Sequence, residues 1–156
     1  LLYIEQPTQR DLENNPPRMD DIAELKPVVA DESLAGTDKI DRIKELGWSG
    51  VALKVCKGQS SAILSHAKAE KSGMPYSVQD STNSGLALIH SAGFTARVNP
   101  IKGFEYNSRQ FRPEANRPYF EEYGPLFIPD EGLVRTEPIK DMKRLNERYN
   151  LVTYMI

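Results

Sequence analysis

Hydrophobic and polar positions alternate along the first hundred residues in a way that predicts strands and helices in turn. Five short apolar runs predict buried strands, at residues 1–5, 27–30, 50–55, 74–79 and 101–105. The segments between them have apolar residues at helical spacing, which predicts helices at 19–25, 38–46, 60–71 and 84–92. This βαβαβαβαβ order, with a repeat of about 25 residues, predicts a parallel sheet with right-handed crossovers.

Individual residues refine two of these helices. Gly47 and Gly73 are expected to end the second and the third helix, because glycine readily adopts the left-handed conformation that closes a helix. In the third helix we expect Ile63, Leu64 and Ala67 to face the core. These signals agree with an α/β fold in which a helix forms each connection between successive strands.

The character of the sequence changes after residue 111. Residues 112–140 are rich in proline and aromatic residues, and we expect an ordered irregular segment that packs over the edge of the sheet. Residues 141–156 mix charged and apolar positions, and we expect a divergent tail with a terminal helix and a short strand. The predicted division is therefore a barrel-like part, 1–111, followed by these two segments.

Length and charge exclude several classes of function. The 156 residues suffice for one domain but fall short of the roughly 200 needed for a complete (β/α)8 barrel. The 20 basic and 22 acidic residues, net −2, argue against nucleic acid or a membrane surface as partner. No apolar run approaches the roughly 20 residues of a spanning helix, and the single Cys56 favours the reducing cytoplasm. The start at Leu1, without a Met, suggests a portion of a longer protein.

Three of the predicted strands end on charged residues: Glu5, Asp31 and Lys54. Because the carboxyl ends of parallel strands meet at one edge, these side chains are expected near each other, at the active-site end of an α/β barrel. Carboxylates are the hard oxygen donors that Mg²⁺ prefers, and desolvation of a lysine next to a cation favours its use as a general base. The alternative is structural: the acids cap helices, and Lys54 forms an ion pair with Asp31 or Glu32.

Five further polar residues are weaker candidates. Gln79, Asp80 and Glu105 end the later strands, where each either orients a substrate or hydrogen-bonds a loop. Glu32 points away from Asp31 because side chains alternate along a strand, so it is expected to support the site through an ion pair. Lys57 begins a helix, where the dipole disfavours a cation, which hints at an anionic partner.

The motifs around these residues resemble a known family. Residues 3–7 (Tyr-Ile-Glu-Gln-Pro), 30–33 (Ala-Asp-Glu-Ser) and 52–54 (Ala-Leu-Lys), with Lys57-Gly58 following, are similar to the enolase superfamily. The most similar branch is that of mandelate racemase and the muconate lactonizing enzymes. The resemblance continues through 103–105 (Gly-Phe-Glu) to about residue 136. Three motifs in order at the family's spacing are far more specific than any one alone.

The resemblance implies a partial (β/α)8 TIM barrel made of strands four to eight with their helices. Glu5 and Asp31 would be the second and third Mg²⁺ ligands, and Lys54 would be the base that removes the proton α to a carboxylate of a small substrate. The metal would stabilise the enediolate formed, and racemisation, epimerisation, dehydration or cycloisomerisation would follow. Glu105, on the last strand, would bind substrate, with Asp80 as a second candidate.

The departures from the family set further expectations. The first metal ligand and the capping domain would lie upstream of Leu1, and Gln79 stands where mandelate racemase has its histidine, which disfavours a histidine-based racemase. The family's usual glycine-rich ending does not follow Lys140, and the tail after it is either divergent or a foreign splice. We expect little or no activity from this chain alone.

The alternative hypothesis is a non-catalytic barrel fragment, stable only with a complementary N-terminal half or with itself. A flavodoxin-like sheet ranks last, because no phosphate-binding loop follows the first strand.

Overall fold

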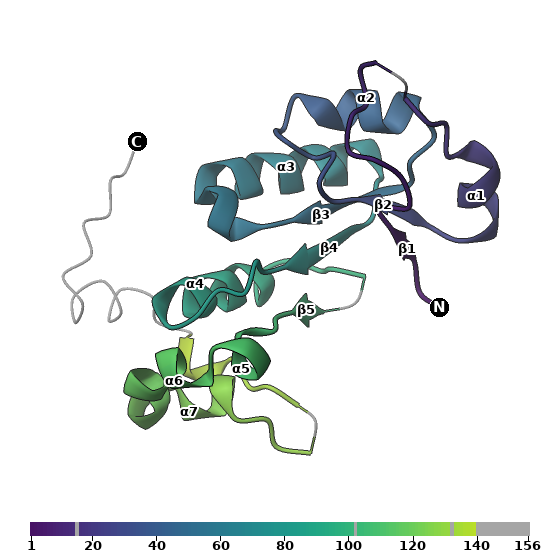
Figure 1. Ribbon diagram of the computed structural model, residues 1–156. Coiled ribbons are helices and arrows are strands. Elements are labelled where there is room, and N and C mark those ends of the chain that lie inside the picture. Colours follow the sequence, from purple (N-terminus) through teal and green to yellow (C-terminus); the bar gives the residue numbers. More distant parts are fainter. Residues whose placement is uncertain (15, 102, 132, 140–156) are drawn as a thin grey trace.

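The computed structural model describes residues 1–14, 16–101, 103–131 and 133–139. Its centre is one sheet of five parallel strands: β1 (Ile4–Glu5), β2 (Val28–Ala30), β3 (Gly50–Leu53), β4 (Tyr76–Gln79) and β5 (Phe104–Glu105). The strands lie in the order β1-β2-β3-β4-β5, so each pairs with its neighbour in sequence (Figure 1). A flavodoxin-like sheet reverses its order after the first strand. The observed order is that of a barrel, and the flavodoxin alternative is wrong.

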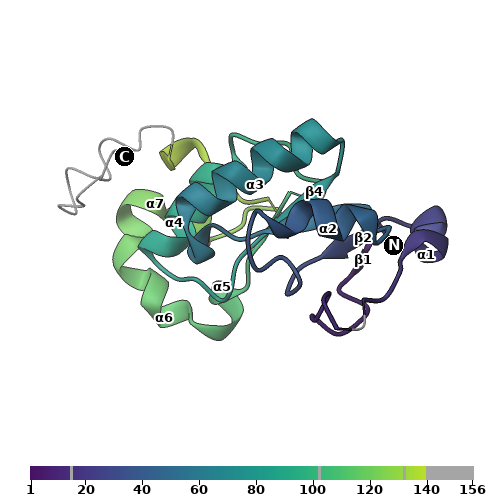
Figure 2. The ribbon, with the colours of Figure 1, turned by 90° about the horizontal axis from the view of Figure 1, so that it is seen from above.

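Four helices connect the strands: α1 (Asp20–Leu25), α2 (Lys39–Glu45), α3 (Gln59–Ser72) and α4 (Leu86–Thr95). A short 3-10 turn, η1 (Val55–Lys57), lies between β3 and α3. Figures 1 and 2 show α1, α2 and α3 together on one side of the sheet, with α2 beside α3. Gly47 and Gly73 follow α2 and α3 with φ values of +82° and +65°, which confirms the predicted helix ends.

The sheet is curled. The side chain of Gln79, on β4, donates a hydrogen bond to the carboxylate of Glu5, on β1, although two strands lie between them. In a flat sheet, strands lie about 4.8 Å apart, which would place these side chains well out of reach. The concave side therefore brings the strand ends together, and the predicted α/β class and partial TIM barrel are confirmed.

The edges of the sheet are shorter than predicted. Leu1 and Leu2 are 88% and 63% exposed and precede β1, whose two residues are half-buried and exposed, so the expected buried strand 1–5 is wrong in its length and in its burial. The central strands β2, β3 and β4 are buried at every residue, as expected for parallel strands covered on both faces.

The main apolar core lies between these strands and the helices. The residues of α3 that face this core are not the predicted ones. Ile63 and Leu64 are 47% and 60% exposed, and Ala67 is exposed as well. The buried positions are instead three small residues, Ala62, Ser65 and Ala69. Ser65 Oγ lies 2.8 Å from Thr37 Oγ1, so the helix approaches its neighbours closely. Periodicity of large apolar residues cannot reveal an inner face built from small ones.

Residues after 107 are more regular than predicted. Instead of an irregular segment the chain forms α5 (Ser108–Phe111), α6 (Pro113–Asn116), a 3-10 turn (Arg117–Tyr119), α7 (Phe120–Phe127) and a 3-10 turn (Glu137–Ile139). Pro113 and Pro118 stand in first turns, where the missing N–H costs little, and α7 is kinked at Tyr123.

This helical segment packs on α4 through a second apolar core. Leu88, Ile89 and Ala92 of α4 meet Tyr123, Leu126, Phe127 and Ile139 there. The predicted terminal helix and strand, within 141–156, lie outside the described residues. Among the helices described, none is long and apolar enough to cross a membrane. The cytoplasmic location stays a prediction.

Candidate active site

The charged strand ends lie at one edge of the sheet. Glu5 is the last residue of β1, Asp31 directly follows β2, and Lys54 directly follows β3. The parallel register pairs Ile4 with Val28 and Val29 with Gly50, which puts all three carboxyl ends on the same side. The prediction that these residues share an edge agrees with the structure.

Asp31 and Lys54 form a buried ion pair. Lys54 Nζ donates to Asp31 Oδ2 at 2.7 Å, and the two side chains are only 14% and 6% exposed. Within the described part of the chain, Asp31 Oδ1 has no hydrogen-bond partner although it is buried. Lys57 Nζ lies 3.9 Å from it, beyond hydrogen-bond range. Buried carboxylate oxygens are nearly always satisfied, so this one marks a place for another donor or a cation.

Glu5 lies close enough to Asp31 and Lys54 to interact with their charges. Its carboxylate accepts from Gln79 Nε2 at 2.5 Å, and Gln79 is buried and also donates to Ser77 Oγ at 3.1 Å. The pKa of Glu5 is raised, first because neighbouring atoms remove water from the carboxylate and then because Asp31 and Glu105 repel its charge. The Gln79 hydrogen bond and the Lys54 charge oppose this rise. Glu5 is therefore electrostatically coupled to Asp31, Lys54 and Glu105.

Asp80 organises loops. Its carboxylate accepts from the backbone N–H of Thr82 at 2.9 Å and of Asn107 at 3.3 Å, which ties the loop after β4 to the one after β5. Burial raises the pKa of Asp80, and these hydrogen bonds lower it in part. Of the two roles left open for Asp80, the structure shows the loop contact. A substrate contact by Asp80, Gln79 or the exposed Glu105 stays a prediction.

The two remaining candidates lie at the margin of this group. Glu32 is exposed, and its supporting role stays a prediction. Lys57 is exposed in the turn η1 beside a small cavity of about 50 Å³, which Lys54 and Ser61 also line. A cavity of this size holds water rather than a substrate.

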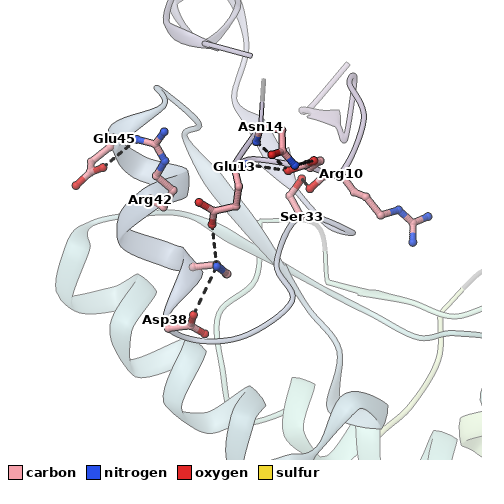
Figure 3. A network of polar contacts seen from close by, with 9 residues as sticks. Arg10, Glu13, Asn14, Ser33, Asp38, Arg42 and Glu45 are labelled. Carbon is pink, nitrogen blue, oxygen red and sulfur yellow. Dashed lines mark hydrogen bonds and ion pairs between the residues drawn. The ribbon is translucent and has the colours of Figure 1, made fainter. Parts of the chain in front are cut away.

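The loop after β1 is attached to the neighbouring loop and helix (Figure 3). Lys39 Nζ, in α2, lies 2.9 Å from Glu13 Oε1 and 3.9 Å from Asp38 Oδ2. Ser33 Oγ donates to the backbone carbonyl of Arg10 at 3.1 Å. The exposed ion pairs contribute little free energy, so the buried Ser33 is the stronger attachment.

Gln6 is the residue that sequence reasoning missed. Its side chain accepts from the backbone N–H of Asp31 at 2.9 Å, and its position before Pro7 gave no hint of this contact. The available signal was the motif itself, in which an amide directly follows the strand-end acid.

The donor set fits part of a magnesium site. In the ranges that the structure describes, no group of three or more His, Cys, Asp or Glu is placed to hold a metal. Glu5 and Asp31 supply two carboxylates of hard oxygen character, and Oδ1 of Asp31 has no hydrogen-bond partner among the described residues. Mg²⁺ is commonly bound by one or two carboxylates together with several waters. Glu5 and Asp31 therefore fit as two of its ligands.

Replacing Glu5 with glutamine is expected to stabilise the protein at neutral pH when no metal is added. The pKa of Glu5 in the folded protein lies above the ordinary 4.5, so unfolding releases a proton between the two values. Stability is thus lost as pH rises through that window and stays lost above it, and Asp80 acts in the same direction. Urea unfolding at pH 4 and pH 7 measures this, with Glu32→Gln as the control. A variant less stable than the parent at pH 7 would contradict it.

Solved structures match the chain, although no protein-family model and no curated protein does. A mandelate racemase/muconate lactonizing protein from Herpetosiphon aurantiacus matches 69% of the chain, with a TM-score of 0.59 and 24% identity. A mandelate racemase/muconate lactonizing enzyme from Roseiflexus sp. matches 67%, with a TM-score of 0.57 and 25% identity. The fold is that of the enolase superfamily.

A third enolase-superfamily structure points the same way. It is a dipeptide epimerase from Cytophaga hutchinsonii in complex with Mg and the dipeptide D-Ala-L-Val, with a TM-score of 0.58 and 22% identity over 68% of this chain. The match covers 31%, 30% and 29% of the Herpetosiphon, Roseiflexus and Cytophaga chains. The chain thus spans about 30% of the length of the solved structures that it matches, and the predicted resemblance is confirmed in the fold.

Proposed function

We propose that this chain supplies part of the active site of a Mg²⁺-dependent enzyme of the enolase superfamily, in the mandelate racemase and muconate lactonizing branch. The proposed reaction removes the proton α to a carboxylate of a small substrate and leads to racemisation, epimerisation, dehydration or cycloisomerisation. The observation that carries the proposal is the buried Oδ1 of Asp31, which has no hydrogen-bond partner among the described residues and lies next to Lys54 at the carboxyl ends of neighbouring barrel strands.

Each of the three strand-end residues has a proposed role. Glu5 and Asp31 would hold the metal, which when bound supplies positive charge that makes the α-proton of a carboxylate substrate more acidic. Lys54 Nζ would accept that proton. Lys54 Nζ now donates to Asp31 Oδ2, so a cation bound to Asp31 would compete with Lys54 for that carboxylate and leave Nζ available to the substrate.

Glu105 is the proposed substrate contact. It ends β5, is exposed, and lies near enough to Glu5 to raise the pKa of that carboxylate. Gln79 and Asp80 rank below it, because both side chains are buried. A substrate that carries a cationic group beside its carboxylate would suit an acid at this position.

Adding Mg²⁺ is expected to raise the melting temperature of the chain. A ligand that binds only the native state stabilises it by about 2.7 kcal/mol at a hundred times its Kd, which for a chain of this size is roughly 5–10 °C. The rise should disappear in Glu5→Gln and in Asp31→Asn, since each removes a proposed ligand. Thermal melting followed by circular dichroism, at increasing Mg²⁺, measures it.

Glu32→Gln is the matched control for this titration. It removes a neighbouring carboxylate that is exposed, so the Mg²⁺ response should match that of the unsubstituted chain. If all four proteins respond equally, binding is non-specific and the proposed site is wrong. If none responds, the charges are structural, a candidate that the 2.7 Å ion pair between Asp31 and Lys54 also favours.

A further inference from the structure

Gln6 adopts an unusual backbone conformation between Glu5 and Pro7. Its φ is +36°, a region that residues other than glycine seldom occupy. A residue before proline is ordinarily extended, so the conformation is doubly disfavoured. Strain of this kind persists only where surrounding contacts fix it, and it concentrates at functional sites. The contacts that fix Gln6 are therefore informative.

The side-chain amide of Gln6 joins the end of β1 to the turn after β2. Oε1 accepts from the backbone N–H of Asp31 at 2.9 Å and from that of Ser33 at 3.2 Å. Nε2 donates to Ser33 Oγ at 2.8 Å and reaches the carbonyls of Thr8 and Gln9 at 3.3 and 3.4 Å. The backbone N–H of Gln6 donates to Val29 O at 2.9 Å, which extends the ladder between the strands.

These contacts bear on the carboxylates rather than on the core. Gln6 is bonded covalently to Glu5 and hydrogen-bonded to the backbone of Asp31, so one residue sets where both acids lie. The turn 31–34 already has its own bond, from Leu34 N–H to Asp31 O at 3.0 Å, and does not need Gln6 to close. Loss of the amide would free the Asp31 N–H while the turn remains.

We propose that Gln6 is a positioning residue, which holds Asp31 close to Glu5 so that both carboxylates can bind the same divalent cation. This rests on the proposed function, because it presumes that the two acids share a metal. Groups that orient metal ligands typically change metal affinity about 10–100-fold when they are removed. The same size of effect is expected here.

The test compares Gln6→Met with Gln9→Met in the full chain, using Mn²⁺ as the probe ion. Methionine keeps the length of glutamine but cannot accept or donate in this geometry, and Gln9 is an exposed residue of the same loop. Titration of free Mn²⁺ by electron paramagnetic resonance gives the Kd. Amide hydrogen exchange, read by NMR, reports on the N–H groups of Asp31 and Ser33.

Gln6→Met should weaken Mn²⁺ binding at least tenfold and speed exchange at Asp31 and Ser33, while Gln9→Met changes neither. Gln6→Glu keeps the acceptor oxygen and should retain slow exchange at both amides.

Three outcomes would contradict the proposal. If Asp31→Asn binds Mn²⁺ more weakly than the unsubstituted chain but Gln6→Met does not, the positioning role is wrong and the proposed function stands. If exchange rises at amides throughout the sheet, the loss of affinity reflects general loosening, which also contradicts it. If the unsubstituted chain binds no Mn²⁺, the proposed function fails and the inference fails with it.

Discussion

Replacing Asp31 with alanine is expected to lower the free energy of unfolding by about 3 kcal/mol, the lower end of the cost of breaking a buried ion pair. The ammonium group of Lys54 would be left in a site where its side chain is only 14% exposed, without the carboxylate that it now meets at 2.7 Å. Binding of Mg²⁺ should be lost at the same time. Urea unfolding at pH 7 measures the first effect and the thermal titration the second.

Two further variants test whether the lost ion pair is the cause of this destabilisation. Lys54→Met in the Asp31→Ala background removes the stranded charge, so the double variant should recover most of the lost stability. Glu32→Ala removes an exposed neighbour and should change stability by no more than about 0.5 kcal/mol. A loss below about 1 kcal/mol for Asp31→Ala would mean that the pair behaves like an exposed one, against the burial seen here.

Replacing Phe127 with alanine is expected to lower the free energy of unfolding by about 3–5 kcal/mol, the usual effect of the cavity left by a buried phenylalanine. Phe127 is 1% exposed and belongs to the core that joins α7 to α4, and its ring centroid lies 5.8 Å from that of Phe120. Because α4 follows the strand that bears Gln79, this core supports one side of the candidate site. Equilibrium unfolding in urea measures the loss.

Phe111→Ala is the matched control, since the same group is removed from a side chain that is 64% exposed. It should leave stability almost unchanged. If α7 and the curled sheet unfold as one unit, Phe127→Ala will shift a single transition. A separate early transition, with the sheet unaffected, would show that the helices after residue 107 are an independent unit.

Much of the candidate site was predictable because it follows from local patterns. Each apolar run that ends on a charge places that charge at a strand end, and parallel strands put those ends at one edge. Glu5, Asp31 and Lys54 were found in this way, without knowledge of any contact between them. The same reasoning left open whether Lys54 pairs with Asp31 or Glu32, because both residues lie beyond one strand end.

Two of the errors share one cause. The inner face of α3 is made of Ala62, Ser65 and Ala69, which a search for large apolar residues overlooks. Helix α6 and the 3-10 turn at 117–119 have prolines in their first turns, which a local reading takes for loop signals. In both places packing against a neighbouring element overrode what the segment showed by itself.

The sequence by itself determined the order of strands and helices, the α/β class and the three charged strand ends, because periodicity and chain position are properties of contiguous residues. Only the tertiary structure decided that Gln79 reaches Glu5 across the sheet, that Lys54 pairs with Asp31, and that Oδ1 of Asp31 has no hydrogen-bond partner among the described residues. It also decided that Gln6 turns toward Asp31. These contacts join residues 23 to 74 positions apart and depend on the curl of the sheet, which no local pattern encodes.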